Sequence, residues 1–373
     1  MGSLRVSVYF LRFYAMVSIQ ITISQSRMCI PEKQAALFIL GDSLFDVGNN
    51  NYINTTTSAQ ANFEPYGGTF FRYPTGRFSD GRVIPDFVAE YAKLPLILPY
   101  LHPASYLDYI FGANFASAGS GALVETRQGT VIDLKTQVSH FKQVSKLLKQ
   151  KLGDVEAKAL LSNAVYIFSI GGNDYSAPFL TTSSTVVLPY RPQQLVDVVI
   201  GNITSVIQEI YKEGGRKLGL LNVGPMNCFP IFRMMKNISS LEACQEEEAS
   251  ANARLHRRAL PTMLQKLEKQ LEGLKYSLTD FYGALVDVMK YPFKYGFLEG
   301  EVACCGGGAY RGDNSCGGKR GIEEFELCDN INDYVFFDSS HPTETAAQHF
   351  ASLMWTGNSD FTHPYNLKQL FNM

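Results

Sequence analysis

A serine directly after an apolar segment is the first candidate for chemistry in this chain. The string Leu37-Phe-Ile-Leu-Gly-Asp-Ser-Leu-Phe-Asp46 begins apolar and ends in a glycine, a carboxylate and a hydroxyl. Such a run predicts a central strand that ends at the edge of a sheet, where ligands bind in open parallel sheets. Ser43 is therefore a candidate nucleophile; the alternative is the N-cap of the next helix. A nucleophile also needs a base and an orienting group nearby.

The histidine best placed to be that base is His341. Asp338 precedes it by three residues, so a carboxylate is close enough to hold one ring nitrogen. Pro342 suits the first position of a helix and disfavours helical geometry at the residue before it, so we expect the imidazole in a loop just ahead of a helix. Asp338 and His341 thus resemble the base and orienting half of a triad; the alternative is a helix-capping histidine. The other histidines lie in a loop, within predicted helices or near the C-terminus: His102, His140, His256, His349 and His363.

Glycine-rich and amide-bearing strings follow two further predicted strands. Asn114-Phe-Ala-Ser-Ala-Gly-Ser-Gly121 follows one strand, and Gly171-Gly-Asn-Asp174 follows the other. The carboxyl ends of parallel strands meet at one edge of a sheet, so we expect these backbone N–H groups and the Asn173 amide to lie near Ser43. Donors at that place suit the oxyanion of acyl transfer. The alternatives are a tight turn for the glycines and a turn or cap role for Asn173.

Apolar strands that alternate with amphipathic helices must position these residues. The predicted strands are Ala35 to Gly41, Tyr109 to Ala116, Ala164 to Gly171, Leu218 to Val223 and Lys275 to Phe281. The predicted helices are Arg82 to Leu94, Val131 to Leu152, Pro192 to Gly214, Leu241 to Leu271 and Pro342 to Trp355. Strands that are hydrophobic throughout favour a parallel sheet covered on both faces. We therefore predict an α/β fold, a three-layer α/β/α sandwich with a central parallel sheet. From chain order, we expect the long loop 49–76 and the cysteine-rich loop 291–332 to flank the mouth of the site.

Composition narrows the class of protein. The chain has 373 residues, of which 46% are hydrophobic and 18% are charged, as in an ordinary globular protein. The net charge is -2 and no basic run stands out, so nucleic acid is not expected as a partner. No segment after the N-terminal region reaches the length of apolar residues that spans a membrane. No composition shift marks a second domain.

The first residues differ in character from the rest. A largely apolar stretch that contains Arg5 and Arg12 precedes Ser24-Gln-Ser-Arg27, which is typical of a signal peptide, although Arg12 interrupts the apolar region. The alternative is an amphipathic N-terminal helix. We predict a signal peptide over residues 1–28, a single domain over residues 29–373, and a secreted protein.

The cysteines favour the same compartment. All but Cys29 lie after residue 200: Cys228, Cys244, Cys304, Cys305, Cys316 and Cys328. An even set in loops predicts disulfides in an oxidising compartment. Zinc is the rival interpretation, but adjacent Cys304 and Cys305 are poorly spaced as ligands and no Cys-x-x-Cys occurs. The pairing cannot be deduced from the spacing, and no metal or cofactor is expected. Sequons at Asn54, Asn202 and Asn237 are acceptable glycosylation sites if the chain is secreted.

Four ordered blocks resemble the GDSL family of SGNH hydrolases: Gly-Asp-Ser-Leu, the block with Gly119, Gly-Gly-Asn-Asp and Asp338-x-x-His341. The longer strings Gly41-Asp-Ser-Leu-Phe-Asp-Val-Gly-Asn-Asn-Asn51 and Pro74-Thr-Gly-Arg-Phe-Ser-Asp-Gly81 are similar to the plant GDSL esterase/lipase branch. The resemblance runs from about Ala35 to the C-terminus. It implies a flavodoxin-like SGNH hydrolase fold and a secreted enzyme that acts on carboxylic esters.

The resemblance also implies roles for single residues. Ser43 would be the nucleophile, and His341, oriented by Asp338, would be the general base and then the general acid. The backbone N–H groups of Ser43 and Gly119, with the Asn173 amide, would form the oxyanion hole. There is no Gly-x-Ser-x-Gly elbow, which disfavours the α/β-hydrolase alternative.

Three functions follow, in decreasing order of support. The first is hydrolysis of small-molecule acyl esters through an acyl-enzyme. The second transfers the acyl group to an alcohol acceptor instead of water, because both reactions share the first half and exclusion of water decides between them. The third is a secreted binding protein without turnover, since fold does not imply function.

Overall fold

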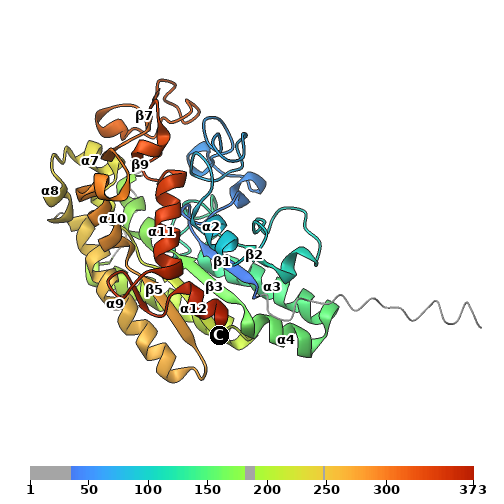
Figure 1. Ribbon diagram of the computed structural model, residues 1–373. Coiled ribbons are helices and arrows are strands. Elements are labelled where there is room, and N and C mark those ends of the chain that lie inside the picture. The colour runs from blue at the N-terminus through green and yellow to red at the C-terminus, as the bar shows by residue number, and fades with distance from the viewer. Residues whose placement is uncertain (1–34, 181–189, 247) are drawn as a thin grey trace, which may run out of the picture. The chain divides into compact units, whose positions relative to one another are not determined.

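One mostly parallel sheet organises the computed structural model, which describes residues 35–180, 190–246 and 248–373 (Figure 1). Its strands, in the order in which they pair, are β10 (Thr362–Pro364), β5 (Lys275–Thr279), β4 (Lys217–Leu221), β3 (Val165–Ser169), β1 (Leu37–Gly41) and β2 (Gly112–Asn114). Strands β1 to β5 are parallel, and β10 is antiparallel to β5. The predicted parallel sheet is thus confirmed, with one antiparallel strand added at its edge.

Strand β1 lies at the point where the strand order reverses. It pairs with β3 on one side, from Leu37 opposite Val165 to Gly41 opposite Ser169, and with β2 on the other. Connections that leave a sheet in opposite directions open a crevice at the carboxyl ends of the strands between them. The residues that follow β1 therefore lie at the place where this class of fold binds its ligands.

Alternate residues of the strands serve two helical layers. Phe38 and Leu40 of β1 point into one apolar cluster, and Leu37 and Ile39 point into the other. The first cluster is covered by α3 (Leu134–Leu152), α4 (Asp154–Asn163), α6 (Pro192–Glu213) and α9 (Glu248–Gln270). The second is covered by α2 (Ile84–Tyr91), α10 (Phe281–Lys290), α11 (Glu344–Thr356) and α12 (Leu367–Asn372). This is the predicted three-layer α/β/α arrangement.

Several elements differ from the sequence-based expectation. The strand expected over 109–116 is shorter, because Asp108–Ile110 form a 3-10 helix and Gly112 has a φ of 120°. The helix expected over 241–271 is described as α8 (Leu241–Glu246) and α9. Five helices were not expected: α4, α5 (Gly172–Leu180), α7 (Pro230–Lys236), α10 and α12. Strand β10 was missed because it is three residues long and ends in a proline.

Two small pairings give structure to the cysteine-rich region. Strand β6 (Glu299–Ala303) pairs in parallel with β9 (Tyr334–Phe336), and β7 (Cys305–Gly306) pairs with β8 (Glu326–Leu327). Strand β9 leads directly into the segment that contains Asp338 and His341. The cysteine-rich region therefore supports the segment from which the candidate base projects.

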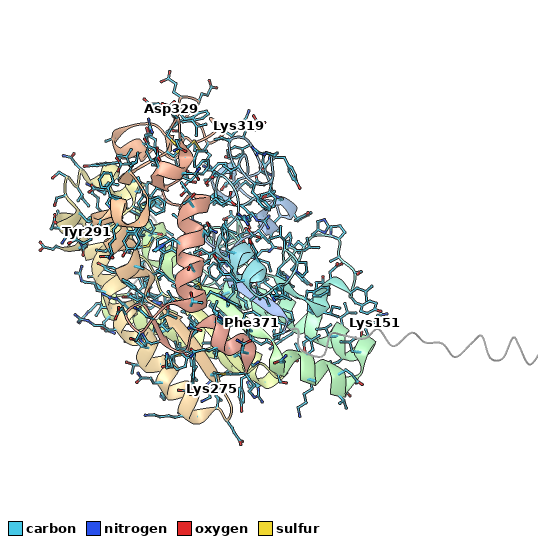
Figure 2. The ribbon with its side chains drawn as sticks, viewed as in Figure 1. Lys151, Lys275, Tyr291, Lys319, Asp329 and Phe371 are labelled. Atoms are coloured by element: carbon cyan, nitrogen blue, oxygen red, sulfur yellow. A yellow bond between two sulfur atoms is a disulfide. The ribbon has the colours of Figure 1, made fainter. Side chains whose placement is uncertain are left out.

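Several charged side chains lie at the periphery of the fold. Lys151, Lys319 and Asp329 are exposed and project outward in Figure 2.

Among the described residues, no helix is both long enough and apolar enough to cross a membrane. The predicted signal peptide and Cys29 lie outside the described residues.

Candidate active site

Ser43 and His341 meet at the sheet edge although 298 positions separate them in the sequence. Ser43 lies in the turn after β1, and its Oγ is 2.8 Å from Nε2 of His341. The start of this turn is fixed to the neighbouring strand, because the N–H of Asp42 donates to the carbonyl of Ser169 at 3.0 Å. At this distance the imidazole can accept the hydroxyl proton.

Asp338 holds the other ring nitrogen of His341. Its Oδ1 is 2.7 Å from Nδ1 of His341 and also accepts the backbone N–H groups of Ser340 and His341, each at 2.9 Å. Burial by itself would raise the pKa of Asp338, but the charge and hydrogen bond of His341, helped by Arg320 and Tyr66, hold that pKa below its usual range. Asp338 is thus an ionised, buried carboxylate that fixes the tautomer and orientation of the imidazole.

The segment between β9 and α11 sets the direction of the imidazole. The N–H of Phe337 donates to the carbonyl of His341 at 2.8 Å and closes a tight turn. The helix begins at Glu344, with Thr343 as the N-cap, so Pro342 lies ahead of the helix and does not occupy its first position. His341 still lies in a loop before the helix, as the proline indicated.

Two residues that the sequence analysis did not single out stand behind Asp338. Tyr66, from the long loop 49–76, is 1% exposed, and its hydroxyl donates to Oδ2 of Asp338 at 2.7 Å. Arg320, from the cysteine-rich region, donates through Nη1 to the Tyr66 oxygen at 2.7 Å and lies over the Tyr66 ring. No sequence signal points to this pair, because its members and Asp338 come from three distant segments.

The expected donors lie around the same pocket as Ser43. Gly119 and Asn173 line this pocket together with Ser43 and His341. The side-chain amide of Asn173 donates to the carbonyl of Ser120 at 3.0 Å, which ties the segment after β3 to the segment after β2. Gly119 has a φ of 86°, which favours glycine at this position. The sequence-predicted residues are therefore assembled at one edge of the sheet.

Asp174 anchors the loop after β2. Its carboxylate accepts the N–H of Ala122 at 2.8 Å, the N–H of Leu123 at 3.0 Å and the hydroxyl of Thr126 at 2.6 Å. A Cβ on Gly121 would lie 2.2 Å from this carboxylate, so only glycine fits there. Asp174 is next to Asn173 in the sequence, and this adjacency was the available signal for its role.

Asp42, the residue before Ser43, is a buried carboxyl group with few polar neighbours. Its Oδ1 accepts the N–H of Leu44 at 3.2 Å and the hydroxyl of Ser169 at 3.4 Å. Burial raises the pKa of Asp42 to about 7, and these hydrogen bonds offset only part of the effect. The group therefore changes its charge near neutral pH.

The other histidines have different surroundings. His256 is fully buried against the Tyr175 hydroxyl, at 2.9 Å, and burial lowers its pKa to about 3. His140 stacks on Tyr100. Within the described ranges, His341 is the one histidine that lies within 4 Å of a carboxylate oxygen.

The pocket around Ser43 has a volume of about 700 Å³. Thr56 and Ser58 of the long loop and Asn314 of the cysteine-rich region line it, as chain order predicted for the mouth of the site. Apolar residues line another part of it: Ile170, Val223, Met226, Phe229, Phe232 and Phe281. The pocket therefore offers an apolar surface and a polar surface to one ligand.

The six cysteines beyond residue 200 pair as three disulfides. These are Cys228–Cys244, Cys304–Cys328 and Cys305–Cys316. The zinc alternative is therefore not supported, because every one of these thiols is in a disulfide. The last two bridges lie in one buried cluster with Tyr66 and Phe337, beside Asp338.

The three sequon asparagines have unequal surroundings. Asn54 and Asn237 are exposed. Asn202 lies within α6, and its side-chain amide donates to the carbonyl of Ala122 at 2.9 Å. The amide nitrogen that would carry a glycan is thus engaged at Asn202.

An α/β/α sandwich with a serine, a histidine and a carboxylate in line at the carboxyl edge of its sheet defines a hydrolase-like protein. Residues 37–354 match the family of GDSL-like lipases and acylhydrolases, and the chain belongs to this family of ester-bond hydrolases. It is 52% identical over 342 residues to GDSL esterase/lipase 5 of Arabidopsis thaliana, and the aligned region covers 91% of this chain and 88% of that protein. It is 46% identical over 370 residues to GDSL esterase/lipase 1 of the same plant, covering 99% and 98%. It is 49% identical over 344 residues to a GDSL lipase of Tanacetum cinerariifolium, covering 92% and 90%.

Proposed function

We propose that this chain is a secreted serine esterase that hydrolyses acyl esters through an acyl-enzyme on Ser43. The observation that carries the proposal is the continuous line of hydrogen bonds from Ser43 through His341 to Asp338, at 2.8 and 2.7 Å. Family membership supports the ester bond as the bond that breaks.

The first half of the reaction forms the acyl-enzyme. Nε2 of His341 takes the hydroxyl proton as Oγ of Ser43 attacks the ester carbonyl carbon. The tetrahedral oxyanion is stabilised by the N–H groups of Ser43 and Gly119 and by the Asn173 amide. The bond between the carbonyl carbon and the alcohol oxygen then breaks, and the alcohol leaves with the proton from His341.

The second half releases the acid. His341 takes a proton from water, the resulting hydroxide attacks the acyl carbon, and the bond to Ser43 Oγ breaks as the proton returns to the serine. Asp338 stays ionised throughout and stabilises the imidazolium in both halves. The apolar surface beside Phe229 and Phe281 suits the acyl chain.

The test is the intact mass of the deglycosylated protein before and after reaction with a fluorophosphonate, with Ser43→Ala beside it. We expect one adduct on the wild-type protein and none on the variant. A folded wild-type protein that takes no adduct and turns over no ester would favour the binding protein without turnover.

If an alcohol attacked the acyl-enzyme in place of water, the protein would be an acyltransferase. Product analysis with a competing alcohol distinguishes the two reactions, because hydrolysis yields the free acid and transfer yields a new ester. Release of free acid as the main product over a range of alcohol concentrations supports the esterase; a new ester as the main product favours the transferase.

Three disulfides and the predicted signal peptide support secretion. The test is expression of the full-length chain with a C-terminal tag in plant cells. We expect the tagged protein in the medium or cell wall, with its N-terminus shortened near residue 28.

A further inference from the structure

The two surfaces of the pocket come from opposite sides of Ser43. Residues after β3, β4 and β5 supply the apolar surface, which includes Val223, Met226 and Phe281. Residues after β1 and β2 supply the polar surface: Thr56, Ser58, Glu125, Thr126, Arg127, Gln128 and Thr130. Since the strand order is β5-β4-β3-β1-β2, a ligand that spans both surfaces has its reacting bond near the middle.

Arg127 lies on the polar surface, beside the expected oxyanion donors. A Cβ placed on Gly119 would lie 3.1 Å from Cδ of Arg127 and 3.3 Å from its Nη1. The guanidinium is therefore held directly over Gly119. The backbone of Arg127 has a φ of 51°. The N–H and the hydroxyl of Thr130 both donate to the Arg127 carbonyl, and these hydrogen bonds fix this conformation.

The charge of Arg127 has no protein partner among the described residues. Its Nε is buried and makes no hydrogen bond, and no described carboxylate pairs with the guanidinium. Two arginines that are more deeply buried than Arg127 are paired: Arg77 forms two hydrogen bonds with Asp86, and Arg233 pairs with Glu301.

An unpaired, largely buried cation is costly to a fold unless something else neutralises it. A guanidinium presents a planar fork of donors that matches the oxygens of a carboxylate or a phosphate. Its position in the pocket and its strained backbone are features that gather at functional sites.

We propose that Arg127 binds an anionic group, a carboxylate or a phosphate, on the alcohol part of the substrate ester. The inference rests on the proposed function, since it requires the ester carbonyl at Ser43. The apolar surface then takes the acyl chain, and the anion lies within a few bonds of the ester oxygen. Release of the anionic alcohol follows acylation, when only the acyl chain stays bound.

The test compares three hexanoyl esters with matched ring alcohols: those of 3-hydroxybenzoate, of 3-hydroxyphenyl phosphate and of the neutral 3-hydroxybenzamide. The assay is run near pH 7 at low salt, where the guanidinium and both anions are charged. Wild-type kcat/KM is expected to be roughly tenfold or more higher for one or both anionic esters than for the amide, as a charge-assisted hydrogen bond would give. The preferred anion identifies the headgroup.

Arg127→Gln is expected to bring that ratio close to one, whereas Arg127→Lys keeps part of it. Arg72→Gln is the matched control, because Arg72 also has a positive φ, of 64°, but is exposed and lies outside the pocket. It is expected to keep the wild-type ratio. Fluorophosphonate labelling of Ser43 in each variant reports that the site is folded.

The outcomes separate the two proposals. Turnover of the amide ester by the wild-type protein with no preference for either anion overturns the role of Arg127 alone. A preference that survives in Arg127→Gln overturns it as well. Absence of both turnover and Ser43 labelling overturns the proposed function itself.

Discussion

The hydroxyl of Tyr66 donates to Oδ2 of Asp338, the oxygen that His341 leaves free. The two oxygens of one buried carboxylate are thus shared between the proposed base and a tyrosine from a distant loop. Arg320 lies behind the tyrosine and lowers the pKa of Asp338 through its charge. Tyr66 and Arg320 are positioning residues in this arrangement, because they act on the reaction through Asp338.

Loss of either residue is expected to change the pH dependence of the enzyme. In Tyr66→Phe and Arg320→Met the carboxylate charge of Asp338 is less compensated, which stabilises the protonated, inactive imidazole of His341. The acidic limb of kcat/KM should therefore move to higher pH in both variants. The measurement is the pH profile of ester hydrolysis between about pH 4 and pH 9. Arg311→Met is the control, because Arg311 lies in the same region but pairs with the exposed Glu326. An acidic limb at the wild-type position in both test variants would contradict this role.

Asn173→Ala is expected to lower kcat by about a hundredfold, equivalent to roughly 3 kcal/mol of transition-state stabilisation. The amide would act only once the oxyanion forms, so KM should change little. The measurement is steady-state kinetics with a thermal melt beside it, since the variant also loses the hydrogen bond to the Ser120 carbonyl. Turnover within a few-fold of wild type would remove Asn173 from the oxyanion hole.

Asp42→Asn is expected to gain stability relative to wild type as the pH rises. The pKa of Asp42 is raised in the fold from 3.8 to about 7, so the folded state holds the proton more tightly than the unfolded state. The stability that the protonated Asp42 contributes is therefore fully present below its pKa in the unfolded chain. It is lost as the pH rises towards the pKa in the fold, about 7. Asparagine stays neutral at every pH and does not lose this stability. The free energy of unfolding of the variant should therefore exceed that of the wild type by a few kcal/mol at the high end of the pH range.

The measurement for Asp42 is urea denaturation of both proteins at several values between about pH 4 and pH 8. Comparison with the variant isolates this group from the other titrating residues. Curves of unfolding free energy that stay parallel over the whole range would show that Asp42 is ionised in the fold.

Glycan occupancy is expected to follow the surroundings of the three sequons. When the chain is secreted from plant cells, Asn54 and Asn237 should carry glycans. Asn202 should not, because it lies within α6 and its amide nitrogen donates to the carbonyl of Ala122. Enzymatic deglycosylation in heavy water followed by peptide mass spectrometry identifies each modified asparagine. A glycan on Asn202 in the folded, active protein would contradict the assignment.

The parts of the fold that could be predicted from the sequence are those encoded by local pattern. Strands such as Val165–Ser169 are apolar throughout, and α3 carries its apolar residues at helical spacing, so both are visible in a short window. Strand β10 is too short for such a pattern, and its place depends on β5 alone. The outer ends of Tyr109–Ala116 were expected as strand because the apolar run continues, but Asp108–Ile110 form a 3-10 helix and β2 begins only at Gly112.

The residues of the site also differ in whether the sequence predicts their positions. Ser43, Gly119 and Asn173 follow strands of one parallel sheet, so topology predicts that they meet. Asp338 and His341 follow β9, which lies outside that sheet, and they were predicted from their spacing and from the family resemblance. Tyr66, Arg127 and Arg320 come from loops, whose paths local sequence does not specify. Their contacts, such as the one between Tyr66 and Asp338 across 272 positions, exist only in the folded chain.

The two edges of the sheet bear on how copies of this protein meet. Both edge strands, β2 and β10, are three residues long, and β10 ends in Pro364, which has no N–H to donate. A bridge from Pro99 to Asn114 also occupies part of the outer side of β2. An exposed edge templates the addition of a strand from another molecule when it is long and unpaired. The edges of this sheet are short and β2 is partly paired, so crowded copies of the protein are poorly suited to join edge to edge into fibrils.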